Sequence, residues 1–276
     1  MKKEKVRVLY VSQEITPFVE ENELSKVARQ LPQGAQESGK EIRTFMPKFG
    51  CINERRNQLH EVIRLSGMNL IINDSDHPLI IKVASIPTAR MQVYFIDNEE
   101  YFQRKAKVTD AKGKFFKDND SRTIFFCRGV LETVKKLGWS PDIVHCHGWM
   151  TSLIPMYIKT SYREDPCFKN SRIIYSAYND EFDGAWAPDF NKRLLMEGVT
   201  NSDVKELKDP NYLTITQNAI RHSDAIIKGS DKLHTNVDAM IKKSGKPVLS
   251  FQTSETMVES CNQFYDEVME EASELV

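Results

Sequence analysis

The sequence predicts an α/β fold built on a doubly wound, mostly parallel sheet with an inserted antiparallel hairpin region. Runs of β-branched residues alternate with runs of helical periodicity, as parallel sheets with crossover helices require. The 276 residues are 40% hydrophobic, which is enough for a sizeable core. No internal repeat, low-complexity tract or linker divides them. We therefore expect one Rossmann-like domain over residues 1–253 and, over residues 254–276, an amphipathic helix packed on it.

The first part of the chain predicts two parallel strands around a helix. Residues 6–12 form a β-branched strand. Residues 23–38 place apolar side chains at helical spacing, and Gly39 is a natural stop. Pro32 lies inside this pattern and should kink the helix. Residues 41–46 form the second strand.

The pattern changes between residues 59 and 96, where short alternating strands replace the longer units. A polar segment at residues 73–78, containing Asn, Asp and Pro, predicts a turn between two of them. We expect an antiparallel excursion here, after which parallel units resume. The excursion strands are predicted at residues 61–65, 79–84 and 91–96, a long helix at 120–137, and the later parallel strands at 142–146, 172–176, 224–227 and 247–251.

Composition and charge exclude several classes of protein. The formal net charge is −1, from 38 basic and 39 acidic residues, so no electrostatic field attracts a nucleic acid. The five cysteines lack paired spacing, which argues against a disulfide framework and a zinc site. No apolar run is long enough for a signal peptide or a membrane span. We expect a cytoplasmic protein that binds neither nucleic acid nor membrane.

Residues 142–157 carry the strongest functional signal. The run Asp-Ile-Val-His-Cys-His-Gly-Trp-Met-Thr-Ser-Leu-Ile-Pro-Met-Tyr leads from a buried strand into a helix through His145 and His147. Polar side chains at the carboxyl end of such a strand lie where open α/β sheets bind ligands. The run resembles the strand–helix junction of bacterial glycogen synthases and plant starch synthases, Asp-Ile-Ile-His-x-His-Asp-Trp-His-Thr-Gly-Leu-x-Pro. Gly148 and Met150 replace an Asp and a His of that pattern.

Further matches to this family follow in order between about residues 6 and 249. Val11-Ser-Gln-Glu-Ile-Thr-Pro-Phe18 is similar to the family's Ser-Glu-x-x-Pro-Phe. Residues 93–104 are similar to Val-Tyr-Phe-Ile-Asp-x-x-x-Tyr-Phe-x-Arg, and the runs Asp118-Asn-x-x-Arg122 and Leu137-Gly-Trp-x-Pro-Asp142 also match. Several matches in the right order indicate common ancestry and a common fold.

The resemblance implies one half of a GT-B architecture, in which two facing Rossmann-like domains hold a sugar nucleotide between them. The family transfers glucose from ADP-glucose to an α-1,4-glucan, and we expect no metal or other cofactor. The matches cover the N-terminal half alone, and the 25 residues after Phe251 are too few for the C-terminal half, which supplies most nucleotide contacts. We therefore expect the isolated chain to be inactive in glucosyl transfer.

The loop after the first strand departs from the family pattern. The family has Lys-Thr-Gly-Gly-Leu, whose lysine and backbone N–H groups contact the donor phosphates. This chain has Glu20, Glu21, Asn22 and Glu23 before Leu24. In a dry cleft each carboxylate would repel a diphosphate by several kcal/mol, even at an effective dielectric of about 20. We expect ADP-glucose binding in the family's mode to be lost and neutral or cationic ligands to be preferred.

We assign no catalytic residue, and the cleft candidates are those that keep or replace polar positions of the family's cleft. Asp118 faces the sugar in the family's pattern, but Asp118 and Arg122 could also pair along a helix. His145 and His147 could line the cleft or pack inside the sheet, and they lack a third ligand for a metal. The candidates are Glu14, Asp118, Asn119, Arg122, His145, His147, Met150, Tyr178 and Asn179.

Three functions remain open at this point, because a fold resemblance does not choose among them. The chain could be a glycosyltransferase completed by a partner polypeptide, a non-catalytic module that binds a glucan or a synthase and regulates it, or a protein-interaction module. Phe182 and Trp186 could stack on a sugar ring or pack over their own domain. Any small ligand should bind at the carboxyl ends of the parallel strands, near residues 19–24, His147, Met150 and Tyr178.

Overall fold

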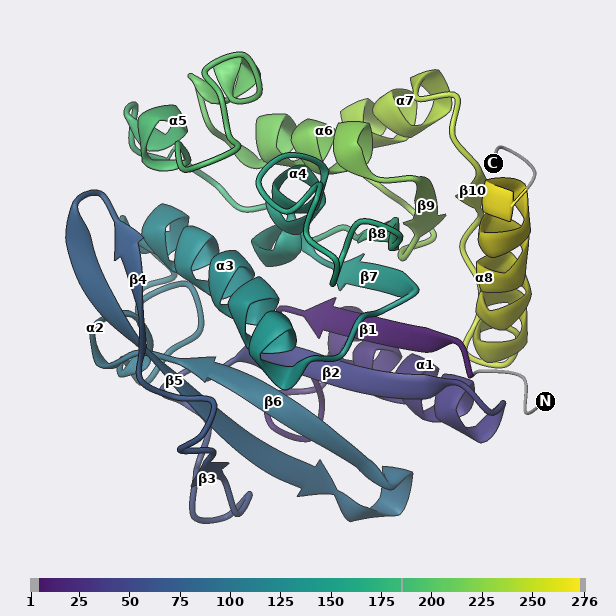
Figure 1. Cartoon of the computed structure of the whole chain (residues 1–276), viewed down its shortest axis with the longest axis horizontal. Helices are drawn as coiled ribbons and strands as arrows, with labels where there is room; N and C mark the ends of the chain where they lie inside the picture. The colour runs from purple at the N-terminus through teal and green to yellow at the C-terminus, as the bar shows by residue number, and fades with distance from the viewer. Residues whose placement is uncertain (1–4, 185, 274–276) are drawn as a thin grey trace.

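The structure is a computed structural model that describes residues 5–184 and 186–273. Its strands form one ten-stranded sheet in the order β10-β9-β8-β7-β1-β2-β6-β5-β3, with β4 paired to β5 off this path. The pairings from β10 to β6 are parallel, and those of β5 with its three partners are antiparallel. Figure 1 shows α3 in front of the central strands and α1 behind them, so helices cover both faces. The predicted fold class is confirmed.

The central strands are buried on both faces, which explains their nearly continuous apolar sequences. The strands are β1 (Arg7–Ser12), β2 (Glu41–Pro47), β3 (His60–Glu61), β4 (Met68–Ile72), β5 (Ser75–Ile86), β6 (Met91–Asp97), β7 (Ile143–His147), β8 (Arg172–Ala177), β9 (Ala225–Lys228) and β10 (Val248–Leu249). The α-helices are α1 (Glu23–Glu37), α2 (Glu99–Phe102), α3 (Asn119–Leu137), α4 (Ile154–Lys159), α5 (Phe190–Arg193), α6 (Tyr212–His222), α7 (Thr235–Lys243) and α8 (Met257–Ser273).

The antiparallel region differs from its prediction in three places, one of which is the turn predicted at residues 73–78, since β5 already begins at Ser75. The strand predicted at residues 61–65 is only the two-residue β3, because residues 63–65 form a turn. The sequence pattern missed β4, where the outward-facing Ile71 is 59% exposed and hides the polar–apolar alternation. Asn73 and Asp74 join β4 to β5 with φ angles of 51° and 59°, the left-handed values that tight hairpin turns favour.

The C-terminal helix α8 lies against α1 and contacts the sheet beneath it. Gly34 of α1 faces Val258 of α8, and a Cβ on this glycine would lie 2.3 Å from Val258 Cγ1. The Tyr265 hydroxyl of α8 is hydrogen-bonded to Nδ1 of His145 in β7 at 2.7 Å. Residues 274–276 of the predicted helix lie outside the described residues. Contact between α1 and α8 is thus so close that only glycine fits at position 34.

A Gly34→Ala variant should lose about 1–3 kcal/mol of unfolding free energy, because the added methyl forces the two helices apart. This loss should exceed the gain of about 1 kcal/mol that alanine brings to a helix interior. Urea unfolding of the purified wild type and variant measures the net change in the free energy of unfolding. The double variant Gly34→Ala, Val258→Ala should recover most of the loss, since it removes the clashing Cγ atoms. Stabilisation by the single variant would contradict tight packing of α8 on α1.

Candidate functional site

A crevice of about 680 Å³ opens at the carboxyl ends of β1, β7 and β8, where the sheet order reverses on either side of β1. The loop after β1 contributes Gln13 and Glu14, the loop after β7 contributes Trp149, and the loop after β8 contributes Asp180. Residues 108–109, 113–117 and 181–184 supply the remaining wall. Open α/β sheets bind their ligands at this kind of reversal point. We refer to this cavity as the crevice.

Aromatic rings form the inner wall of the crevice. Phe182 stacks on Phe115 with ring centroids 4.6 Å apart, and its centroid lies 4.8 Å from that of Trp149. Behind them, Trp186 stacks on Phe182 at 5.5 Å. Phe182 and Trp186 are largely buried, so they pack over their own domain, but Phe115, Phe182 and Trp149 also line the crevice. Such rings offer an apolar surface of the kind that the C–H face of a sugar contacts.

Glu14 is the sequence-predicted candidate that lines the crevice. Its Oε2 accepts hydrogen bonds from Nζ of Lys107 at 2.8 Å and from Nδ2 of Asn22 at 2.6 Å. Only 9% of the residue is exposed. Glu14 therefore links the loop after β1 both to the start of α1 and to the segment that leads into the crevice wall.

The start of α1 is closed by its own side chains. Oδ1 of Asn22 accepts the backbone N–H of Ser25 at 2.8 Å, and Oγ of Ser25 accepts the backbone N–H of Asn22 at 2.8 Å. This capping box satisfies two of the donors that a helix N-terminus otherwise offers to an anion. The family resemblance places the donor phosphates at this end of α1. In this chain the capping box already occupies part of it.

The acidic residues of this loop do not enclose a dry cleft, which corrects the expectation from the sequence. Glu20, Glu21 and Glu23 are exposed, and Glu21 pairs with Lys26 at 2.9 Å. Glu23 accepts a hydrogen bond from the hydroxyl of Ser230. In water, two charges 4 Å apart interact by only about 1 kcal/mol, so each carboxylate repels a phosphate far less than expected.

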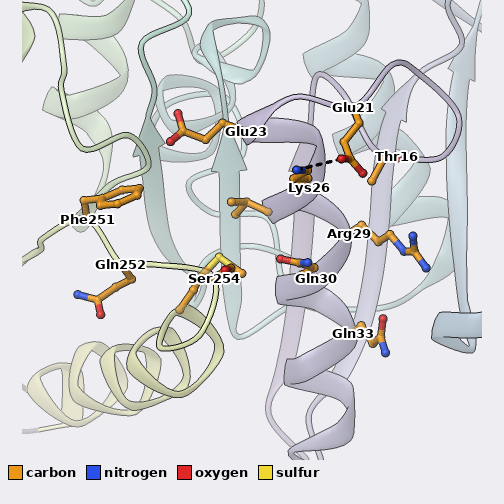
Figure 2. Close-up of a pocket in the computed structure, with 12 residues that line it drawn as sticks. Thr16, Glu21, Glu23, Lys26, Arg29, Gln30, Gln33, Phe251, Gln252 and Ser254 are labelled. Carbon is orange, nitrogen blue, oxygen red and sulfur yellow. Dashed lines mark ion pairs between the residues drawn. The ribbon is translucent and has the colours of Figure 1, made fainter.

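Glu21 and Glu23 line a groove of about 600 Å³ on the outer side of α1, distinct from the crevice. Figure 2 shows Lys26 and Arg29 on the α1 side of this groove and Phe251 on the opposite side, with the Glu21–Lys26 ion pair dashed. Both signs of charge are present in the lining. The crevice has charged groups of its own, which include Lys114 and Lys117 as well as carboxylates.

Asn119 and Arg122 are fully buried and support the crevice wall from behind. Nδ2 of Asn119 donates to the carbonyl of Val108 at 2.8 Å. Nη1 of Arg122 donates to Oδ1 of Asn119 at 2.6 Å and to the carbonyl of Lys107 at 2.8 Å. Burial, together with the nearby guanidinium of Arg104, lowers the pKa of Arg122 to about 10. These two candidates hold the loop that leads into the wall.

Asp118 pairs with Arg104 at 2.9 Å, and the alternative of an ion pair with Arg122 along the helix is wrong. The reason is geometric: Arg122 points into the core toward the rings of Phe102 and Phe116, whereas the side chain of Asp118 is 37% exposed. Asp118 does not line the crevice. It therefore anchors the segment around Arg104.

His145 and His147 lie entirely inside the fold, so the packing alternative describes both. Their ring centroids are 3.9 Å apart. The His145 ring is hydrogen-bonded to the hydroxyls of Tyr265 and Ser176, each at 2.7 Å, and Nδ1 of His147 is 2.9 Å from the hydroxyl of Tyr178. Burial lowers the pKa of His147 to about 3 and that of His145 well below its usual value, so both rings are neutral at pH 7.

Three further candidates also fall outside the crevice lining. Met150 is fully buried, and its backbone N–H donates to Oε1 of Gln13 at 3.1 Å. Tyr178 is buried, and Asn179 is exposed with its backbone N–H donating to Ser230 at 3.1 Å. The crevice therefore lies beside the predicted residues. Its lining includes Trp149 and Asp180, whereas Met150 and Tyr178 were predicted to line it.

Asp180 is the crevice residue that the sequence reasoning did not select. Its Oδ2 accepts the backbone N–H of Trp149 at 3.0 Å, and its Oδ1 accepts the hydroxyl of Tyr212 at 3.2 Å. Burial raises the pKa of Asp180 to about 7, those two hydrogen bonds oppose the rise, and the carboxylate of Glu14 adds to it. An acidic residue just after a central parallel strand was the available signal, since ligand sites concentrate there.

Residues 5–184 and 186–273 lack two features that would indicate other kinds of site. No three His, Cys, Asp or Glu side chains in this part of the chain gather as they would to hold a metal ion. No helix in it combines the length and the apolar character that crossing a bilayer demands.

Comparisons with known proteins agree on one family. The family model described as the starch synthase catalytic domain matches residues 7–241. The glycogen synthase of Chlorobium luteolum is 37% identical over 237 residues, which are 86% of this chain and 48% of that protein. The glycogen synthase of Chlorobaculum tepidum is 36% identical over 234 residues, 84% of this chain and 47% of that protein.

A solved structure shares the fold. The catalytic domain of starch synthase IV from Arabidopsis thaliana, bound to ADP and acarbose, superposes with a TM-score of 0.73 over 91% of this chain and 52% of that one. Sequence identity in this superposition is 18%, so the likeness concerns the fold alone. The chain spans about half the length of the glycogen synthases that it matches.

Proposed function

Because this chain belongs to the family of starch synthase catalytic domains, we propose that its crevice binds an α-1,4-glucan and that the start of α1 does not bind ADP-glucose in the family's mode. The chain is a glycogen/starch synthase-like glycosyltransferase domain. The self-capped start of α1 supports the donor part of the proposal, and the aromatic rings beside carboxylates in the crevice support the glucan part. On this view the chain by itself holds a sugar polymer without transferring glucose to it.

The contacts at the start of α1 oppose binding of the donor phosphates. A phosphate group at a helix N-terminus needs free backbone N–H groups and a favourable charge. Here the backbone N–H groups of Asn22 and Ser25 are already hydrogen-bonded, and no lysine stands at the position of Glu20. Displacing the cap to admit a phosphate would cost about 1 kcal/mol of helix stability in addition to the charge repulsion.

The crevice offers the groups that a glucan acceptor would contact. Phe115, Trp149 and Phe182 offer apolar ring surface, and Glu14 and Asp180 offer carboxylate oxygens beside it. Apolar surface next to a few fixed hydrogen-bonding groups is the combination that small-molecule sites use. A neutral sugar polymer meets both requirements, whereas a diphosphate would meet four carboxylates against the two lysines, Lys114 and Lys117, of the lining.

Calorimetry of the purified chain tests the proposal, with maltoheptaose, acarbose, ADP and ADP-glucose as probes. We expect saturable binding of maltoheptaose, no binding of ADP, and no transfer of labelled glucose from ADP-glucose to glycogen. Binding and turnover of ADP-glucose would contradict the donor part of the proposal. Binding of none of these probes would contradict the glucan part and favour a protein-binding role.

Restoring the family's loop should raise the affinity for ADP. The variant Glu20→Lys, Glu21→Thr, Asn22→Gly, Glu23→Gly removes the cap and three carboxylates, and it adds one cation. We expect at least about tenfold tighter binding of ADP, equivalent to about 1.4 kcal/mol. A control variant with Glu20, Glu21 and Glu23 each changed to Gln keeps Asn22, and it should gain less because the amides stay capped. Equal affinity in the two variants would show that the cap is irrelevant.

A further inference from the structure

Asp180 joins three parts of the crevice. From the loop after β8 it accepts the backbone N–H of Trp149, after β7, and the hydroxyl of Tyr212, on α6. It lines the crevice together with Gln13 and Glu14. The two carboxylate oxygens can accept four hydrogen bonds in all, and the backbone N–H of Asp180 itself is a third partner, so acceptor capacity remains for a ligand.

The same contacts fill the backbone donors at the start of the loop after β7. Gly148 has a φ of +84°, and the next two backbone N–H groups belong to Trp149 and Met150. Asp180 accepts the first, and Oε1 of Gln13 accepts the second at 3.1 Å. Successive backbone N–H groups after such a turn bind anions when they are free. An anionic ligand in the crevice would therefore find these two donors already occupied by side chains.

We propose that Asp180 determines ligand specificity in the crevice, by excluding anions and by accepting hydrogen bonds from adjacent hydroxyls of a neutral sugar. This inference rests on the proposed function, in which the crevice binds a glucan. Phe115 and Trp186 cover the two faces of the Phe182 ring, so a sugar ring would contact the half-buried Phe115, and its hydroxyls would meet the polar groups of the lining, which include Glu14 and Asp180. A carboxylate binds hydroxyl donors more strongly than a neutral oxygen does.

The charge on Asp180 should then control the affinity for the sugar. Burial places the pKa of Asp180 near 7, so the carboxyl changes charge between pH 6 and 8. Burial also raises the pKa of Tyr175, Tyr178 and Tyr212, which keeps these neighbours protonated over that range. The charged and titratable groups that face Asp180 or the crevice beside it are Glu14 with its partner Lys107, Tyr175, Tyr178, Tyr212, Lys114, Lys117, Glu181 and Asp183.

Calorimetry with maltoheptaose at pH 6, 7 and 8 tests the assignment. Wild-type affinity should rise about three- to fivefold across this range, as the stronger charge-assisted bonds form. The rise should vanish in Asp180→Asn, which keeps the acceptor for Trp149 but cannot ionise. The matched Asp183→Asn variant, on the same loop and rim, should keep the rise.

The possible results separate the two claims. The role of Asp180 is overturned if maltoheptaose binds and the pH dependence survives in Asp180→Asn. It is also overturned if maltoheptaose binds to the wild type without any pH dependence. In both cases the proposed function stands. Failure of the wild type to bind at any pH overturns both. A ¹³C NMR titration of the Asp180 carboxyl in the wild type needs no variant: saturating maltoheptaose should lower its midpoint by about 0.7–1 pH unit, and an unchanged midpoint also overturns the role.

Discussion

Truncation of the chain after Ser254 is expected to leave a protein that aggregates or unfolds at a much lower temperature. The truncation removes α8, of whose side chains five among residues 257–270 are buried against the rest of the fold. Burial of each such side chain contributes about 1.5–3 kcal/mol, so their loss is on the order of 10 kcal/mol, comparable with the whole stability of a typical domain. The apolar face left behind would also promote association. The five side chains are Met257, Cys261, Phe264, Tyr265 and Val268.

Thermal unfolding and size-exclusion chromatography would measure this loss. Two single variants on α8 serve as matched controls. Phe264→Ala, at a buried position, should cost about 3–5 kcal/mol, whereas Glu267→Ala, at an exposed position, should change stability by less than about 0.5 kcal/mol. A soluble truncated chain with an unchanged melting temperature would show that α8 is not part of the folded unit.

Lowering the pH from 7.5 to 4.5 should destabilise the wild type by about 3 kcal/mol more than it destabilises a His147→Gln variant. In the folded protein His147 stays neutral down to a pKa of about 3, whereas in the unfolded chain it is protonated below about pH 6.5. The stability that follows from this difference is complete above pH 6.5 and is lost as the pH falls. His145, whose pKa is also lowered, acts in the same direction.

Urea unfolding at the two pH values gives this difference directly. Asp180 has the opposite sign, because its raised pKa makes the folded state more favourable as the pH falls from 7 toward 4, but it is present in both proteins and cancels. The exposed His60 provides the control, and His60→Gln should leave the pH dependence as it is in the wild type. The same acid sensitivity in His147→Gln and the wild type would mean that His147 is protonated inside the fold.

Most of the fold could be predicted because its signals are local. Each parallel strand is a short β-branched run, and the helix pattern beginning at residue 23 follows one of them. The missed β4 shows where this reasoning fails. Its pattern of buried and exposed residues alternates, but the exposed Ile71 is apolar, so the sequence itself does not alternate.

The candidate site was less predictable because its geometry depends on distant partners. His145 and His147 are two residues apart in β7 and therefore point to the same face of the sheet. Whether that face is open or covered depends on Tyr265, 120 residues further along the chain, which contacts His145. The role of Asp180 likewise depends on Tyr212, which lies 32 residues further along the chain on α6. No local pattern reports such contacts.

The position of β1 has a consequence for synthesis on the ribosome. β1 lies between β2 and β7 in the sheet, and Val8 pairs with Ile143, about 135 residues later in the chain (Figure 1). At about 5–20 residues per second, one edge of this apolar strand stays unpaired for roughly 7–27 s after it leaves the exit tunnel. Unpaired strand edges recruit other chains. The nascent polypeptide, before residue 147 emerges, is therefore the species that most needs a chaperone.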